Sequence, residues 1–104
     1  MMQVTQETRD DWRVVTVRGR ADSVTADELE ETLTAIVGEH KKVAVDFRAL
    51  DYISSAGLRA VIQAARAAQG HGEFAVCSPS AAVKKVFDMS GMKAIIDIRE
   101  SLPC

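Results

Sequence analysis

Two neighbouring serines, Ser54 and Ser55, lie where an apolar segment gives way to a segment with helical periodicity. Residues 43–47 are almost wholly apolar and predict a strand, and the segment that follows the serines predicts a helix to about Gln69. A helix N-terminus carries unpaired backbone N–H groups and the positive end of the macrodipole, so it stabilises an anion. A phosphorylated serine is such an anion, and phosphate acceptance is the chemistry that this position favours.

The same position has a purely structural interpretation, because a serine oxygen often caps a backbone N–H group at a helix start. Ser54 and Ser55 are both candidates for that cap. Gly57 favours the functional interpretation, since a missing side chain lets a partner backbone or a phosphate approach closely. Arg59, one helical turn after Ser55, can screen a phosphate there.

The first half of the chain predicts a hairpin and a helix before the serines. The hairpin turns at residues 9–11, and its second strand, from residue 12, ends at Gly19. Residues 25–28 fit a capping box, in which Thr25 and Glu28 satisfy free N–H groups at a helix start. The helix then carries one apolar stripe and stops at Gly38.

The second half predicts a strand, a helix and a final strand. The strand covers residues 73–77, and the helix starts with Ser78 as its cap and Pro79 at its first position. Ser90 and Gly91 stop that helix, and residues 94–98 form the last strand. The order β-β-α-β-α-β-α-β predicts one α/β domain over residues 1–104, with a mixed, mostly parallel sheet of about five strands and three to four helices on one face.

The bulk properties exclude several classes of protein. The chain has 104 residues and a net charge of −2, which argues against nucleic acid or an anionic membrane surface as its main partner. Cys77 lies in a strand and is expected to be buried, Cys104 is the last residue, and no disulfide is expected. Neither a signal peptide nor a membrane-spanning run is evident, so we expect a cytoplasmic protein.

The other candidate residues do not suggest catalysis. His40 and His71 are expected in exposed loops, no histidine is close to the serines in sequence, and Cys and His do not have the spacing of metal ligands. We therefore predict no catalytic residue, no metal and no cofactor. Met89 and Met92 are either core residues or an adaptable apolar contact for a partner.

Three segments in the right order carry a resemblance to a known family. Residues 19–29, residues 43–46 with 52–58, and residues 83–91 resemble the motifs of a STAS domain of the anti-sigma-factor antagonist type. Many relatives have Asp before the phosphoacceptor and Ser or Thr after it, where this chain has Ser54 and Ala56. Ser55 matches the phosphoacceptor position, and the departure makes Ser54 a second candidate.

The resemblance implies a partner switch. The unphosphorylated antagonist would bind an anti-sigma factor that is also a serine kinase of the histidine-kinase-like ATPase fold, and so free a sigma factor. Phosphorylation of Ser55 would end the complex, and a serine phosphatase would reset it. The resemblance and the helix start together predict these partner-binding residues: Asp22, Ser23, Thr25, Ser54, Ala56, Gly57 and Arg59.

Two other functions fit the same fold. One is a stand-alone STAS subunit that docks on the ATPase of a membrane transport system without phosphorylation. The other is a sensor of a small ligand. The serine at position 55 favours the antagonist, because a purely structural subunit has no need of a hydroxyl there.

Overall fold

A computed structural model describes residues 2–103 of the chain. The sheet begins with an antiparallel hairpin of β1 (Met2–Arg9) and β2 (Trp12–Ala21), paired from Met2 with Gly19 to Arg9 with Trp12. Strands β3 (Lys42–Asp46), β5 (Glu73–Cys77) and β6 (Asp97–Arg99) extend the sheet in parallel from β2. The strand order is β1-β2-β3-β5-β6, so the predicted mixed, mostly parallel sheet is confirmed.

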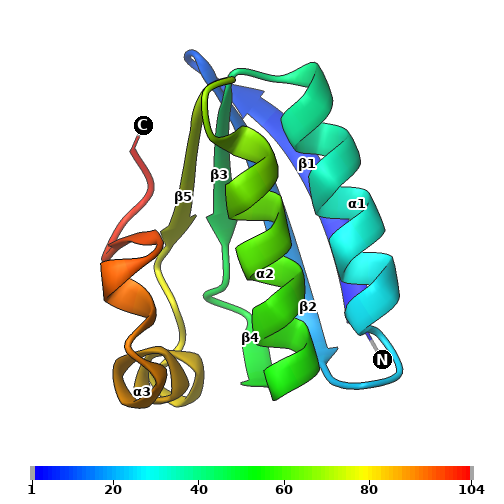
Figure 1. The fold of residues 1–104 in the computed structure, drawn as a ribbon, viewed down its shortest axis with the longest axis vertical. Coiled ribbons are helices and arrows are strands. Elements are labelled where there is room, and N and C mark those ends of the chain that lie inside the picture. The colour runs from blue at the N-terminus through cyan, green and yellow to red at the C-terminus, as the bar shows by residue number, and fades with distance from the viewer. Residues whose placement is uncertain (1, 104) are drawn as a thin grey trace.

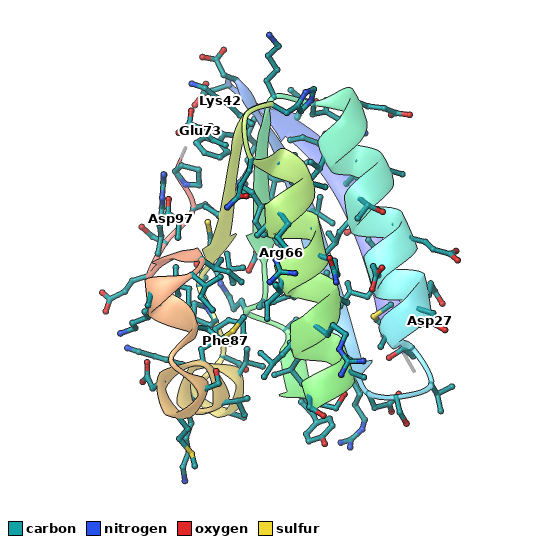
Figure 2. All side chains as sticks on the ribbon, in the orientation of Figure 1. Asp27, Lys42, Arg66, Glu73, Phe87 and Asp97 are labelled. Carbon is teal, nitrogen blue, oxygen red and sulfur yellow. The ribbon has the colours of Figure 1, made fainter. Side chains whose placement is uncertain are left out.

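The helices lie on one face of the sheet, as predicted. Helices α1 (Ala26–Glu39) and α2 (Ser55–Ala68) run side by side in front of the strands, and α3 (Ala81–Ser90) lies at one end, where it contacts β4 (Figure 1). The apolar stripe of α1 is fully buried against β2, β3 and α2. The Phe87 side chain of α3 joins the same core, with its ring centroid 6.2 Å from that of Phe47 (Figure 2).

The sequence did not predict one strand, β4 (Leu50–Ile53), which immediately precedes the serines. It pairs in parallel with the far end of β2 and lies off the main strand order. The pairing register shifts between Gly19 and Arg20, and Gly19 has a φ of 97°, which glycine adopts readily. Gly19 therefore forms a bulge within β2. The prediction that Gly19 ends the strand is wrong, because β2 continues to Ala21.

Two predicted helix boundaries are also wrong. The cap of α3 is Ser80, whose Oγ accepts a hydrogen bond from the Val83 N–H at 3.3 Å. Ser78, the predicted cap, instead donates its backbone N–H to the Arg99 carbonyl oxygen. Helix α1 runs through Gly38 to Glu39. The predicted end of α3 at Gly91 is confirmed, because Gly91 has a φ of 72° and terminates the helix.

The last strand begins later than predicted. Residues 92–94 form the short 3₁₀ helix η1 (Met92–Ala94), whose Met92 carbonyl accepts the N–H groups of Ile95 and Ile96. This turn buries Met92 and Ile96 against the core and delays the strand to β6. Of the two methionines left open above, Met92 is therefore a core residue and Met89 is exposed.

The helix-free face of the sheet holds a second, smaller buried cluster. Trp12 packs there with Cys77 and three other apolar side chains, and Leu102 covers part of the cluster. The expected burial of Cys77 is confirmed, whereas Cys104 lies outside the described residues. Between residues 2 and 103, no helix has the length and apolar character needed to cross a membrane.

Candidate functional site

The candidate site is the start of α2, directly after β4. Ser54 is the N-cap of this helix and has an extended backbone. Its Oγ accepts a hydrogen bond from the Gly57 N–H at 3.1 Å, and its carbonyl oxygen accepts one from the Leu58 N–H at 2.8 Å. Ser54 is also half-buried. Of the two serines that compete for the cap in the sequence, Ser54 therefore has the structural role.

Ser55 is the first residue of α2 and its side chain is exposed. Its Oγ has no hydrogen-bond partner among residues 2–103, so no histidine or carboxylate in the described chain activates it as a nucleophile. The hydroxyl lies at the positive end of the helix dipole, beside backbone N–H groups without helical partners. The Ser55 hydroxyl is therefore exposed at a helix end that favours negative charge.

Arg59 and Gly57 lie on different sides of this helix. Arg59 is exposed, one turn after Ser55, and has no ion-pair partner within the described residues. Gly57 is buried, and a Cβ there would lie 2.8 Å from the Ala21 carbonyl oxygen and 2.9 Å from Ile53 Cγ1. The missing side chain at position 57 therefore lets α2 pack closely on the end of β2. The sequence suggested that Gly57 lets a partner approach the helix closely, but the space beside Gly57 is filled by Ala21 and Ile53.

The turn between β2 and α1 is built around Asp22. One carboxylate oxygen, Oδ1, accepts the backbone N–H groups of Val24 at 3.0 Å and Thr25 at 3.1 Å. These two hydrogen bonds, first that of Thr25 and then that of Val24, lower the pKa of Asp22 below its ordinary value. The carboxylate is therefore ionised at neutral pH and holds the turn together.

Thr25 does not form the predicted capping box. It occupies the position before α1, but its Oγ1 donates to the Arg20 carbonyl oxygen at 2.9 Å and accepts from the Asp22 N–H at 3.0 Å. No side-chain hydrogen bond caps the helix from this residue. The prediction is wrong because the hydroxyl closes the preceding turn, which the sequence pattern does not distinguish from a helix cap.

The turn between β2 and α1 lies beside the start of α2, at one end of the molecule (Figure 1). Ala21 of β2 is the direct partner of Ile53 in β4, and the Ala21 carbonyl accepts the Ser54 N–H at 2.8 Å. The structure thus brings Asp22, Ser23 and Thr25 next to the start of α2, together with Ala56. Ser23 is exposed, whereas Asp22, Thr25 and Ala56 are half-buried.

Two apolar residues at this site are exposed, although neither is among the partner-binding residues predicted from the sequence. Val24 lies in the Asp22 turn with 86% of its surface exposed, and Tyr52 of β4 is 40% exposed. The Arg20 guanidinium lies over the Tyr52 ring, 4.4 Å from its centroid. An isolated apolar residue in an otherwise polar turn was the available signal for Val24.

The remaining candidates do not join this site. Asp46 accepts the Arg48 N–H at 2.9 Å and so shapes the turn after β3. His71 is exposed and His40 is half-buried after α1. Over residues 2–103, His, Cys, Asp and Glu form no group that could hold a metal ion. The site therefore consists of an exposed hydroxyl, a helix N-terminus and a neighbouring ordered turn.

This fold and site define a small α/β domain of the STAS class, with a serine at the start of its second helix. Residues 3–103 match the family model described as the STAS domain. The chain therefore belongs to the STAS domain family.

Two relatives with an anti-sigma factor antagonist description align with almost the whole chain. BtrV of Bordetella bronchiseptica, a candidate anti-sigma factor antagonist, is 35% identical over an alignment of 102 residues that covers 96% of this chain and 88% of BtrV. The crystal structure of an anti-sigma factor antagonist from Mycobacterium paratuberculosis has a TM-score of 0.90 at 23% identity. That alignment covers 98% of this chain and 88% of the other.

SpoIIAA, the anti-sigma factor antagonist and Bacillus cell fate determinant, has the same fold in two solved forms. The unphosphorylated form has a TM-score of 0.70 at 16% identity and covers 96% of this chain and 90% of its own. The phosphorylated form has a TM-score of 0.69 at 19% identity, with 92% of this chain and 90% of its own covered. The STAS fold thus occurs both with and without phosphate.

Proposed function

We propose that this protein is an anti-sigma factor antagonist that is switched off by phosphorylation of Ser55. The observation that carries the proposal is the division of roles at the start of α2, where Ser54 caps the helix and the Ser55 hydroxyl stays exposed. The 35% identity with BtrV over 96% of the chain supports the class of function. Ser54, the second candidate acceptor, is less suited because its Oγ already accepts the Gly57 N–H.

In the unphosphorylated state, the surface around Ser55 binds an anti-sigma factor, and the sigma factor held by that partner is released. The binding surface is formed by exposed and half-buried residues at the start of α2 and in the neighbouring turn: Asp22, Ser23, Thr25, Ser54, Ala56 and Arg59. Gly57 contributes indirectly, because its packing on Ala21 sets the position of α2. A neutral hydroxyl at the centre of this surface carries a small desolvation penalty compared with a charged group.

The anti-sigma factor is also the serine kinase in this proposal, with an ATPase fold like that of histidine kinases. The Ser55 oxygen forms a bond to the γ-phosphorus of ATP, the bond from that phosphorus to the β-phosphate oxygen breaks, and ADP leaves. The hydroxyl proton is lost to the kinase or to water. The chain is thus the substrate of this transfer, and its own residues supply a reachable oxygen. Since the donor is ATP, the switch operates in the cytoplasm.

Phosphorylation then separates the two proteins. The phosphate adds a charge of about −1.5 to −2 at neutral pH. Burial of that charge in the interface carries a large desolvation penalty, whereas in the free protein the helix N-terminus and Arg59 stabilise it. The phosphate therefore favours the free state. A serine phosphatase that hydrolyses the phosphoserine returns the protein to its binding form.

Affinity capture with the Ser55→Ala protein tests the proposal, because this variant keeps the neutral surface and cannot be phosphorylated on residue 55. We expect it to retain from cells of the source organism one protein with the ATP-binding fold of a kinase and the function of an anti-sigma factor. Addition of ATP should release the wild-type protein from that partner and leave Ser55→Ala bound. Retention of a transporter ATPase instead, or ATP-dependent release of both proteins, would contradict the proposal.

A further inference from the structure

Val24 is the most exposed large apolar residue of the described chain. Its exposed fraction is 86%, compared with 79% for Met89, 59% for Ile95 and 40% for Tyr52. An isolated exposed apolar side chain is common and needs no explanation by itself. Val24 differs from an ordinary case because of where it lies and how its backbone is held.

The backbone of Val24 is fixed from both sides. Its N–H donates to Asp22 Oδ1 at 3.0 Å, and the next residue, Thr25, donates its own N–H to the same oxygen. The Thr25 hydroxyl closes the turn further, with hydrogen bonds to the Arg20 carbonyl and the Asp22 N–H. The valine side chain thus projects from an ordered turn. An apolar group that is already ordered loses little conformational entropy when a partner buries it.

The same turn adjoins the start of α2. Asp22 follows Ala21, whose carbonyl accepts the Ser54 N–H at 2.8 Å and against which Gly57 packs. Asp27, on the first turn of α1, lies at this end of the molecule (Figure 2). Arg66 and Asp97, which line one groove with Ile95, lie away from it. Val24 is therefore a neighbour of the Ser55 surface, whereas Ile95 is not.

We propose that Val24 is the apolar anchor of the interface with the anti-sigma factor and enters an apolar pocket on that partner. Asp22 acts as a positioning residue that holds Val24 in place, and its carboxylate does not contact the partner. This inference rests on the proposed function of the Ser55 surface. It names Val24 as a main source of binding energy. It also makes Asp22, predicted from the sequence as a partner contact, a residue that positions Val24.

Val24→Thr tests the anchor, because threonine keeps the branched shape and exchanges one methyl group for a hydroxyl. The probe is the anti-sigma factor that Ser55→Ala captures, purified and measured by titration calorimetry. We expect roughly tenfold weaker binding for Val24→Thr, as for an anchor residue at an interface. Ile95→Thr is the matched control and should change the affinity less than twofold. Equal effects of the two variants, or no effect of Val24→Thr, would overturn the anchor.

Two substitutions of Asp22 test its positioning role. Asn also offers an Oδ1 acceptor, so Asp22→Asn should retain the turn and bind within about twofold of the wild type. Asp22→Ala removes the acceptor and should weaken binding about as much as Val24→Thr does. The double variant Asp22→Ala/Val24→Thr should then bind little more weakly than either single variant, because both act through one contact. Loss of binding in Asp22→Asn would show a direct charge contact and overturn this role.

Ser55→Asp, measured with the same purified anti-sigma factor, distinguishes failure of the Val24 anchor from failure of the Ser55 switch. If Ser55→Asp abolishes binding and Val24→Thr does not weaken it, the switch stands and the anchor is wrong. If Ser55→Asp binds as well as the wild type, the proposed function itself fails.

Discussion

The starts of α2 and α3 are built from the same cap and have different chemistry. Ser54 Oγ accepts the Gly57 N–H at 3.1 Å, and Ser80 Oγ accepts the Val83 N–H at 3.3 Å. Each serine thus caps its helix by accepting the N–H of the third residue after it. The Ser80 hydroxyl also donates to the Leu50 carbonyl oxygen at 2.6 Å, and Ala81 follows it. Ser54 is followed by Ser55, whose hydroxyl is exposed.

This difference shows why a serine at a helix start is not by itself a functional site. At α3 the one hydroxyl caps the helix and links it to β4, so no reactive oxygen remains. At α2 the cap is supplied by Ser54, and the oxygen of the next serine has no structural role. A modification site in this setting needs a second hydroxyl, because the first is required for the helix.

The largest expected effect is on partner binding by Ser55→Asp. A carboxylate places a permanent negative charge where the phosphate would lie, and its burial in the interface is unfavourable. We expect the affinity for the purified anti-sigma factor to fall about 100-fold, which corresponds to roughly 2.7 kcal/mol. Binding is measured by calorimetry, with Ser80→Thr as a control that keeps a hydroxyl at the start of α3. If the affinity of Ser55→Asp changed by less than threefold, Ser55 at the start of α2 would be no more important for binding than Ser80 at the start of α3.

The next effect concerns the stability of α3. Ser80→Ala removes the cap and leaves the Leu50 carbonyl oxygen without its donor. We expect the free energy of unfolding to fall by about 2 kcal/mol, measured by urea denaturation monitored by circular dichroism. A loss below about 0.5 kcal/mol would show that Ser80 does not hold α3 to β4.

Ser54→Ala should have a smaller effect, because Ser54 contributes the cap alone. Loss of the hydrogen bond from the Gly57 N–H should lower the free energy of unfolding by about 1 kcal/mol. Ser55→Ala is the matched control in the same helix turn and should stay within about 0.5 kcal/mol of the wild type, since its hydroxyl is exposed. The reverse order of these two variants in denaturation would mean that Ser55 is the cap.

The smallest effect is a pH dependence at the Asp22 turn, beside α1. The folded-state pKa of Asp22 is lowered from 3.8 by the N–H groups of Thr25 and Val24. Its contribution to stability is therefore present above the unfolded-state pKa and is lost as the pH falls through the folded-state pKa. We expect the amide resonances of Val24 and Thr25 to shift together in this acidic range. Asp22→Asn should abolish the titration, and a titration that persists in this variant would assign it to another group.

The sequence predicted most of the fold, because its elements have strong local signals. The stripe of Leu29, Leu33, Ile36 and Val37 identified α1 and its buried face. Strand β4 could not be predicted, because its four residues do not alternate between buried and exposed side chains and its pairing with β2 contains a register shift between Gly19 and Arg20. Such a pairing is set by tertiary contacts rather than by local pattern.

The candidate site was predicted in position and not in its details. The helix start was predicted from residue types and the neighbouring Asp22 turn from the resemblance to STAS domains, but the assignment of the cap to Ser54 depended on the backbone conformation. Thr25 could not be assigned from residue type either. Its hydroxyl could cap α1 or close the preceding turn, and in the structure it bonds to the Arg20 carbonyl and the Asp22 N–H of the turn. From the sequence, Gly57 was predicted to have a role in partner binding. Its burial against Ala21 could not be predicted, because that burial depends on how α2 packs on β2.

The most direct test of the central claim is phosphopeptide mapping after incubation with the captured anti-sigma factor and ATP. Wild-type protein and Ser54→Ala should each carry one phosphate on residue 55, and Ser55→Ala should carry none. A phosphate on Ser54 in the wild-type protein, or an unmodified wild-type chain after full incubation, would contradict the account.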